Sequence, residues 1–168
     1  GGAWTMITDS ASNNTSSFQF NTGITSAYKT YVFVISNIDS GHGSTNAFMY
    51  VGGTSNTYGN IYWTSDYQYI STMDNSNSGN YSPLTSNSNT RFFLGDSWGS
   101  GMGIVWLSDP ANANTKKLVN WSCSHVDNSG YVRRSFSAGR WNGDNSAIDR
   151  VKFEIGTSTT GRITMYGI

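Results

Sequence analysis

The chain has 168 residues, the usual size of one domain; only 12% of them are charged, and the formal net charge is zero. Without a surplus of cations, it is not expected to bind nucleic acid by neutralising phosphates or to act as a polybasic membrane-surface module. No apolar run is long enough to span a membrane, and the single cysteine, Cys123, excludes a disulfide within the chain.

The residue types favour strands over helices. The chain contains 18 Asn, 26 Ser and 18 Thr, while Leu occurs only four times and Glu once, at Glu154. Leu and Glu are among the best helix formers, whereas the abundant Tyr, Phe, Trp, Val, Ile and Thr suit a pleated, half-buried surface. Aromatic residues make up 14% of the chain, which is more than disordered chains carry. We therefore predict a folded, all-β protein.

Short apolar runs separated by turn-forming residues predict about ten strands. In chain order, the candidate strands are Trp4–Thr8, Phe18–Phe20, Tyr28–Ser36, Asn46–Val51, Asn60–Trp63, Tyr67–Thr72, Arg91–Leu94, Gly103–Leu107, Lys116–His125, Gly130–Trp141, Ile148–Ile155 and Gly161–Ile168. The polar stretch Asp9–Ser17 separates the first two. Asp74–Asn89 is predicted to be a long loop, because it has little to bury.

Two of these segments have informative patterns. Tyr28–Ser36 is apolar on both faces, which predicts a central strand, and Ile148–Ile155 alternates as a half-buried antiparallel strand does. No segment has helical periodicity, and no linker or repeat divides the chain. We predict one antiparallel β-sandwich, jelly-roll-like, over residues 1–168. The chain begins at Gly1 without a Met, so we expect residues upstream of it in the full protein.

One segment matches a catalytic motif. Gly95-Asp96-Ser97-Trp98-Gly99 has the spacing of a nucleophile elbow, which requires a strand before the serine and a helix after it. Glycines and another apolar strand follow instead, and the one histidine downstream is His125. We interpret the segment as a glycine-rich turn and the protein as no enzyme, with a hydrolase acting through Ser97 as the minor alternative.

Metal and cofactor sites are not indicated either. Asp74–Gly79 has the spacing of the first half of a calcium loop, but Thr85 stands where the bidentate Glu is needed. One Glu and nine scattered Asp suggest no carboxylate pair for glycoside hydrolysis. Two histidines and one cysteine give no metal-ligand spacing. The sequence predicts no metal and no cofactor.

An aromatic cluster is the strongest candidate for a binding site. Five aromatic residues and one carboxylate lie close together in the sequence: Tyr58, Tyr62, Trp63, Asp66, Tyr67 and Tyr69. Aromatic faces beside polar groups suit sugar rings, but Tyr and Trp are also enriched at protein interfaces and pack in sandwich cores. Core or intersubunit packing is the favoured interpretation, and contact with a glycan or receptor is the alternative.

Two terminal segments carry a resemblance to a known family: the opening Gly1-Gly2-Ala3-Trp4-Thr5-Met6-Ile7 and the closing Gly161-Arg162-Ile163-Thr164-Met165-Tyr166-Gly167-Ile168. They resemble the ends of the C-terminal β-sandwich domain of tailed-phage structural proteins of the tail-fibre or virion-appendage type. Between them, Tyr28–Val34, Gly103–Pro110 and Ala147–Phe153 follow in the same order as the family's parts. The likeness extends over nearly the whole chain and supplies no catalytic residues.

The resemblance implies a non-enzymatic virion structural protein at the particle surface, in an exposed fibre or appendage or as capsid decoration. Its expected partners are other virion proteins or copies of itself, in a homo-oligomer for which a trimer is one form. The alternative is a carbohydrate-binding module that recognises a host surface glycan. Neither nucleic acid nor a membrane is an expected partner.

Overall fold

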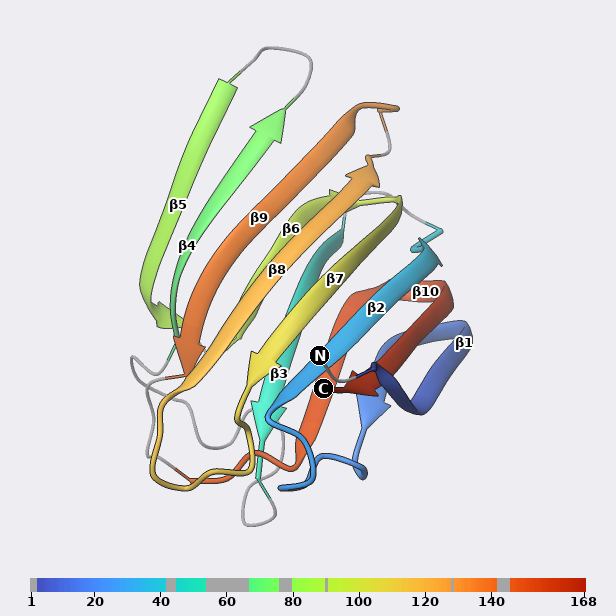
Figure 1. The fold of residues 1–168 in the computed structure, drawn as a ribbon. Coiled ribbons are helices and arrows are strands. Elements are labelled where there is room, and N and C mark those ends of the chain that lie inside the picture. The colour runs from blue at the N-terminus through green and yellow to red at the C-terminus, as the bar shows by residue number, and fades with distance from the viewer. Residues whose placement is uncertain are drawn as a thin grey trace.

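The computed structural model describes residues 3–41, 45–53, 67–75, 80–89, 91–127, 129–141 and 146–168, with the backbone alone for 12–14, 67–75 and 80–89. These residues form ten strands and no helix, so none of them makes a helix that could cross a membrane. The strands are β1 Thr5–Phe20, β2 Thr30–Asp39, β3 Thr45–Gly52, β4 Tyr67–Asn75, β5 Asn80–Asn89, β6 Phe92–Trp98, β7 Ser100–Ser108, β8 Lys117–Val126, β9 Val132–Trp141 and β10 Arg150–Gly167 (Figure 1).

All of the strand pairs are antiparallel, in the order β5-β4-β9-β8-β7-β2-β10-β3-β6, with β1 on the free side of β10. The order divides into two layers. The front sheet runs from β5 to β2 and includes the second half of β10. The back sheet contains β6, β3 and the first half of β10. This two-layer, antiparallel arrangement confirms the predicted all-β sandwich.

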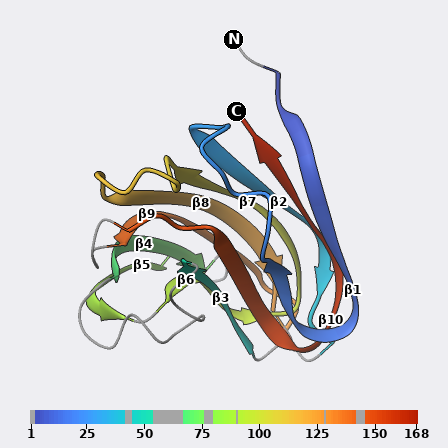
Figure 2. The ribbon, with the colours of Figure 1, turned by 90° about the horizontal axis from the view of Figure 1, so that it is seen from below.

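The long β10 joins the two layers. Its first half pairs with β3 through Arg150–Ile155, and its second half pairs with β2 through Thr160–Gly167. Strand β1 follows β10 along both halves, and Figure 2 shows the two passing together along one side of the sandwich. The bend in β10 uses a left-handed backbone at Gly156, with φ of +71°, and another positive φ at Gly161.

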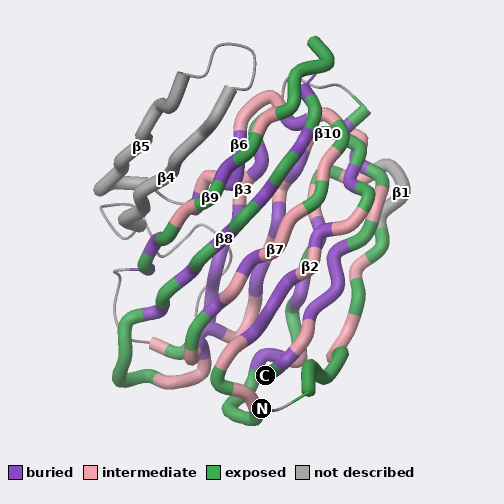
Figure 3. Tube along the Cα trace, turned by 45° about the horizontal axis from the view of Figure 1, so that its top comes forward, coloured by how far each residue is buried: buried purple, intermediate pink, exposed green. Residues whose placement is uncertain are grey.

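The core lies between the layers. Along β8, buried and exposed residues alternate without interruption, as Figure 3 shows, so alternate side chains reach the interior. The inward Trp121 lies against Phe92 of β6, with ring centroids 5.9 Å apart, and Phe33 of β2 lies against Phe153 of β10 at 5.3 Å. These contacts between the front and back sheets fix which face of each sheet is inside.

The structure confirms two of the predicted patterns. Strand β2 lies between β7 and β10, as its two apolar faces predict. In the first half of β10, Val151, Phe153 and Ile155 are buried and the intervening residues are partly exposed, as the alternation predicts.

Three boundary predictions were wrong. The polar stretch Asp9–Ser17 is part of β1. The two strands predicted at the end of the chain are one strand, β10, which pairs with β1 along nearly its full length. The predicted loop Asp74–Asn89 contains the end of β4 and all of β5, which pair backbone to backbone. β5 ends the strand order, a position that tolerates Pro83, which has no N–H to donate.

Candidate functional site

The outer face of the front sheet carries a group of exposed apolar side chains. Met102, Val126, Val132 and Phe136 belong to the adjacent strands β7, β8 and β9, and 62%, 38%, 54% and 43% of their surface is exposed. Val126 pairs directly with Val132, and Met102 and Phe136 each pair with a serine of β8. We call these four residues the outer patch. Exposed apolar side chains that are grouped on one face of a domain often mark a surface that contacts another molecule.

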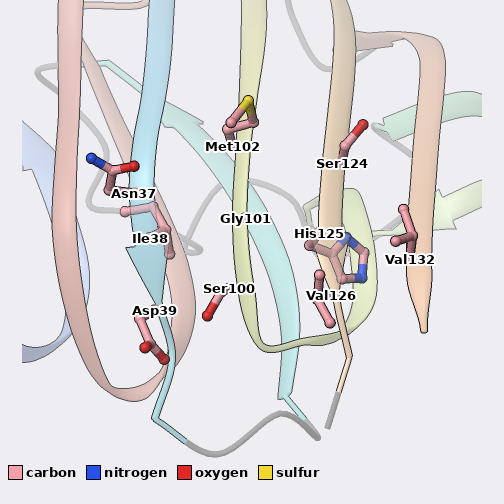
Figure 4. Close-up of a pocket in the computed structure, with 10 residues that line it drawn as sticks. All are labelled: Asn37, Ile38, Asp39, Ser100, Gly101, Met102, Ser124, His125, Val126 and Val132. Atoms are coloured by element: carbon pink, nitrogen blue, oxygen red, sulfur yellow. The ribbon is translucent and has the colours of Figure 1, made fainter. Parts of the chain in front are cut away.

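A shallow groove crosses this face beside the outer patch (Figure 4). It consists of two adjoining hollows of about 490 and 530 Å³, which share Asn37, Met102 and Ser124 in their walls. The groove walls are more apolar than polar, and Met102, Val126, Val132 and Ile104 are among the residues that line them. Serine hydroxyls and the Asn37 amide supply the neutral polar part, and Asp39 is the one carboxylate. Asn37 has a φ of +49° at a bulge in β2, which turns this part of the strand out of the regular ladder. The groove therefore offers apolar side chains, hydroxyls and an amide, with little charge.

His125 lies at the floor of the groove and is only 2% exposed. Its ring stacks on Trp98, with centroids 4.6 Å apart and planes within 9°. Its Nε2 lies 2.7 Å from the carbonyl oxygen of Asp96, which can only accept, so Nε2 carries the proton. Nδ1 is buried without a partner in the described structure. Burial lowers the pKa of His125, against the opposing effect of the Asp96 carbonyl and carboxylate.

A charged bridge closes the end of the sandwich next to His125. Arg133 donates from Nε to Asp127 at 2.7 Å and from Nη1 to Asp96 of β6 at 3.0 Å. Asp127 also accepts backbone hydrogen bonds from Ser129 and Tyr131, which shape the β8–β9 turn. Burial alone would raise the pKa of Asp127, but these hydrogen bonds outweigh it and hold the pKa below its usual value. The bridge ties β6 to β9 next to the groove.

Arg133 and Arg134 are adjacent on β9 and point to opposite faces of the sheet, as the alternation of a strand predicts. Arg133 enters the bridge, while the exposed Arg134 lies over the ring of Phe136, 4.6 Å from its centroid. Arg134 is therefore part of the surface around the outer patch.

Four of the five residues of the nucleophile-elbow motif belong to the end of β6, and the tight turn to β7 is made at Gly99. Ser97 has a φ of +48° near the end of β6, and β7 begins at Ser100, so no helix follows it. The turn carries the chain from the back sheet to the front sheet, which explains its glycines. A Cβ atom at position 99 would lie only 2.4 Å from the carbonyl oxygen of Val126, so the backbone passes too close there for any residue but glycine.

The predicted aromatic cluster falls largely outside the described residues. Tyr58, Tyr62, Trp63 and Asp66 are not among them, and for Tyr67 and Tyr69 the structure describes the backbone alone. In the ladder, Tyr67 pairs with Trp141 and Tyr69 pairs with Gly139, which places both on β4 beside β9. The cluster thus remains a prediction, and the outer patch is a surface that the sequence analysis missed.

No group of three or more His, Cys, Asp or Glu side chains gathers as a metal site among the residues with described side chains. Cys123 is a free, fully buried thiol, and burial raises its pKa to about 12, against the lowering effect of a hydrogen bond with Ser135. A thiol with so high a pKa is a poor nucleophile and metal ligand at neutral pH.

Comparisons with known proteins define no family for the chain. No family model and no curated protein matches it. Among solved structures, a scytalido-glutamic peptidase with a transition state analog inhibitor has a TM-score of 0.28 at 15% identity, over 89% of this chain and 66% of that one. The botulinum neurotoxin serotype C1 binding domain has a TM-score of 0.26 at 10% identity, over 95% of this chain and 41% of that one.

A legume lectin-like domain from Entamoeba histolytica has a TM-score of 0.22 at 7% identity, over 95% of this chain and 79% of that one. The chain spans less than two thirds of the length of the first two of these proteins. All three TM-scores are too low to carry an argument about this protein.

Proposed function

We propose that this chain is a non-enzymatic structural module of a bacteriophage virion, displayed on a fibre, on another appendage or as capsid decoration. In this proposal it assembles with copies of itself or with neighbouring virion proteins. Two things support the proposal: the resemblance of its terminal segments to tailed-phage appendage domains, and the exposed outer patch.

The outer patch is the observation that carries the proposal. Its four side chains project from three adjacent, hydrogen-bonded strands. Because the backbone is already ordered there, binding to this surface has a small cost in conformational entropy. The outward residues between them on β8 are Ser122 and Ser124, and the charged neighbour of the patch is Arg134, which lies over the ring of Phe136. Neutral hydroxyls cost less to desolvate than charges, so the face suits burial against another protein.

The native mass of the full chain tests this function. Light scattering over a hundredfold range of protein concentration is expected to show a dimer or a larger closed oligomer at the upper end. A monomer at every concentration would rule out self-assembly of the chain. Immunogold labelling of purified particles with antibodies to the chain would then decide whether it docks on another virion protein.

The groove favours a second candidate function, the recognition of a host surface glycan. It combines an amide, several hydroxyls and the side chain of Met102, and sugars present both hydroxyls and apolar C–H faces. A glycan array probed with the full chain tests this function. If no glycan on the array binds the chain, glycan recognition is ruled out. If binding is unchanged when Met102 and Asn37 are substituted, the glycan site lies elsewhere on the molecule.

A further inference from the structure

Three charged side chains meet on the outer face of the back sheet. The only glutamate, Glu154, lies beside Lys152 on β10, across the ladder from β3 with Phe48 and Tyr50. Arg91 precedes β6 and reaches the same place. Three separate segments of the chain therefore meet at one cluster, which we call the Arg91 cluster.

A chain of hydrogen bonds orders the cluster. Lys152 donates to one oxygen of Glu154 at 2.5 Å, and the Tyr50 hydroxyl donates to the other at 2.6 Å. Arg91 in turn donates from Nη1 to the oxygen of Tyr50 at 2.8 Å, and its guanidinium carbon lies 3.5 Å from the ring centroid of Phe48. The guanidinium is thus held on an aromatic face and oriented by a hydroxyl.

The charges of the cluster do not cancel. Glu154 is neutralised by Lys152; burial alone would raise the pKa of Glu154, but the hydrogen bonds from Lys152 and Tyr50 outweigh this and hold the pKa below its usual value. Burial raises the pKa of Tyr50, so this residue is a neutral partner for Arg91. Among the described residues, no carboxylate forms an ion pair with Arg91. The cluster therefore has one cation in excess, and that cation is Arg91.

A hollow of about 350 Å³ opens beside this cation. The residues in its walls include Arg91 and Glu154, the exposed Asn46 and Ser16, and the half-buried Phe48. The volume lies near the lower end of the roughly 300–1,000 Å³ typical of small-molecule sites, which suits one ring better than a chain of them. The walls supply donors, acceptors and an apolar surface together.

We propose that the hollow beside Arg91 binds a carboxylate-bearing sugar. The carboxylate of the sugar pairs with the guanidinium of Arg91, in the planar, two-bond geometry that arginine favours. The ring hydroxyls bond with Glu154 and with the Asn46 amide, and the C–H edge lies near Phe48. This inference goes beyond assembly through the outer patch, because it concerns the opposite face of the sandwich, and it does not depend on the groove.

Binding of three probes to the full chain tests the inference: glucuronic acid, glucose and acetate, each followed by the amide shifts of the protein in NMR titrations. Glucuronic acid is expected to bind more tightly than glucose, which lacks the carboxylate, and than acetate, which lacks the ring. The largest shifts are expected at 45–48, 91 and 154–156. Added salt is expected to weaken the binding of glucuronic acid but not that of glucose.

Substitutions complete the test. Arg91→Gln is expected to weaken glucuronic acid binding by about tenfold or more, since a hydrogen bond to a charged group is worth about 1.5–3 kcal/mol. Arg134→Gln, an exposed arginine on the opposite face, is the matched control and is expected to leave the affinity unchanged. If Arg91→Gln does not fold, the shift map and the salt dependence of the unmodified chain decide.

The inference is overturned if glucuronic acid does not bind, if it shifts other residues, or if Arg91→Gln binds it as well as the unmodified chain does. Equal binding of acetate and glucuronic acid would make the hollow a general anion site and would also overturn it. The native mass of the same samples separates this inference from the proposed function. A monomer that binds glucuronic acid would refute self-assembly alone, and an oligomer that does not bind it would refute the sugar site alone.

Discussion

The imidazole of His125 lies flat on the indole of Trp98, 4.6 Å away, and this contact links β8 of the front sheet to β6 of the back sheet. Both rings sit under the groove, where Gly95 and Gly101 leave room for them: a Cβ at Gly101 would lie 2.6 Å from that of His125 and 2.8 Å from the Trp98 ring. The pair depends on a neutral imidazole, since Nδ1 has no acceptor for a second proton among the described residues.

Stability is therefore expected to depend on pH through His125. Its folded pKa lies below the ordinary value of 6.5, so between the two values the unfolded chain binds a proton that the folded chain does not. This contribution is complete above about pH 6.5 and declines as the pH falls below it. Urea unfolding of the unmodified chain and of His125→Gln between pH 8 and pH 5 measures the effect. Parallel declines in the two proteins would show that His125 is not the cause.

Arg133 and Arg134 are adjacent in the sequence but are expected to differ in their effect on stability. Arg133→Gln removes the partner of the nearly buried Asp127 and the link from β9 to Asp96, so the midpoint of thermal unfolding should fall by several degrees. Arg134→Gln removes only an exposed contact with Phe136, so its midpoint should stay close to that of the unmodified chain. Calorimetry of both variants measures the difference. Equal midpoints would contradict a structural role for the bridge.

The thiol of Cys123 is expected to be inert in the folded protein. It is fully buried and its pKa is raised to about 12, so almost no thiolate exists at pH 8. A chromogenic disulfide reagent should release no colour from the native chain over minutes and one equivalent at once in guanidinium chloride. Rapid reaction of the native chain would show that β8 opens readily.

Phe136 is expected to contribute to association more than to stability. Phe136→Ser removes from the outer patch an apolar side chain that is 43% exposed. It also removes the exposed cation–π contact with Arg134, which is worth about 0.5–1 kcal/mol. The free energy of unfolding should therefore change by no more than about 1 kcal/mol, while the association constant should fall by about tenfold. Met6→Ser, at an apolar residue on β1 that is 58% exposed, is the control and should leave association unchanged.

Strands with a clear pattern of buried side chains were predicted from the sequence. β2 was predicted because it is buried on both faces over Tyr31–Phe33, and the first half of β10 because it buries alternate side chains. The extent of β1 and the existence of β5 were not predicted. Their polar residues pair through the backbone with β10 and β4, and no hydrophobic period marks such pairing.

The sites were harder to predict, because they depend on register between distant segments. Phe136 and Met102 are far apart in the chain and meet only because both pair with β8. Glu154 was noted as the only glutamate, but its contact with Tyr50 depends on how β10 pairs with β3. For the nucleophile-elbow motif, the local sequence correctly predicted that a strand and not a helix follows, but the motif itself belongs mostly to β6 and was wrongly interpreted as a turn.

Oxidative footprinting of the methionines tests most directly the claim that the outer patch is an assembly interface. Met102, in the patch, and Met6, outside it, are 62% and 58% exposed, so in the isolated chain both should oxidise quickly, while the buried Met49 and Met165 should not. As protein concentration rises, Met102 is expected to become protected from oxidation while Met6 continues to react. Equal oxidation of Met102 and Met6 at every concentration would contradict that claim.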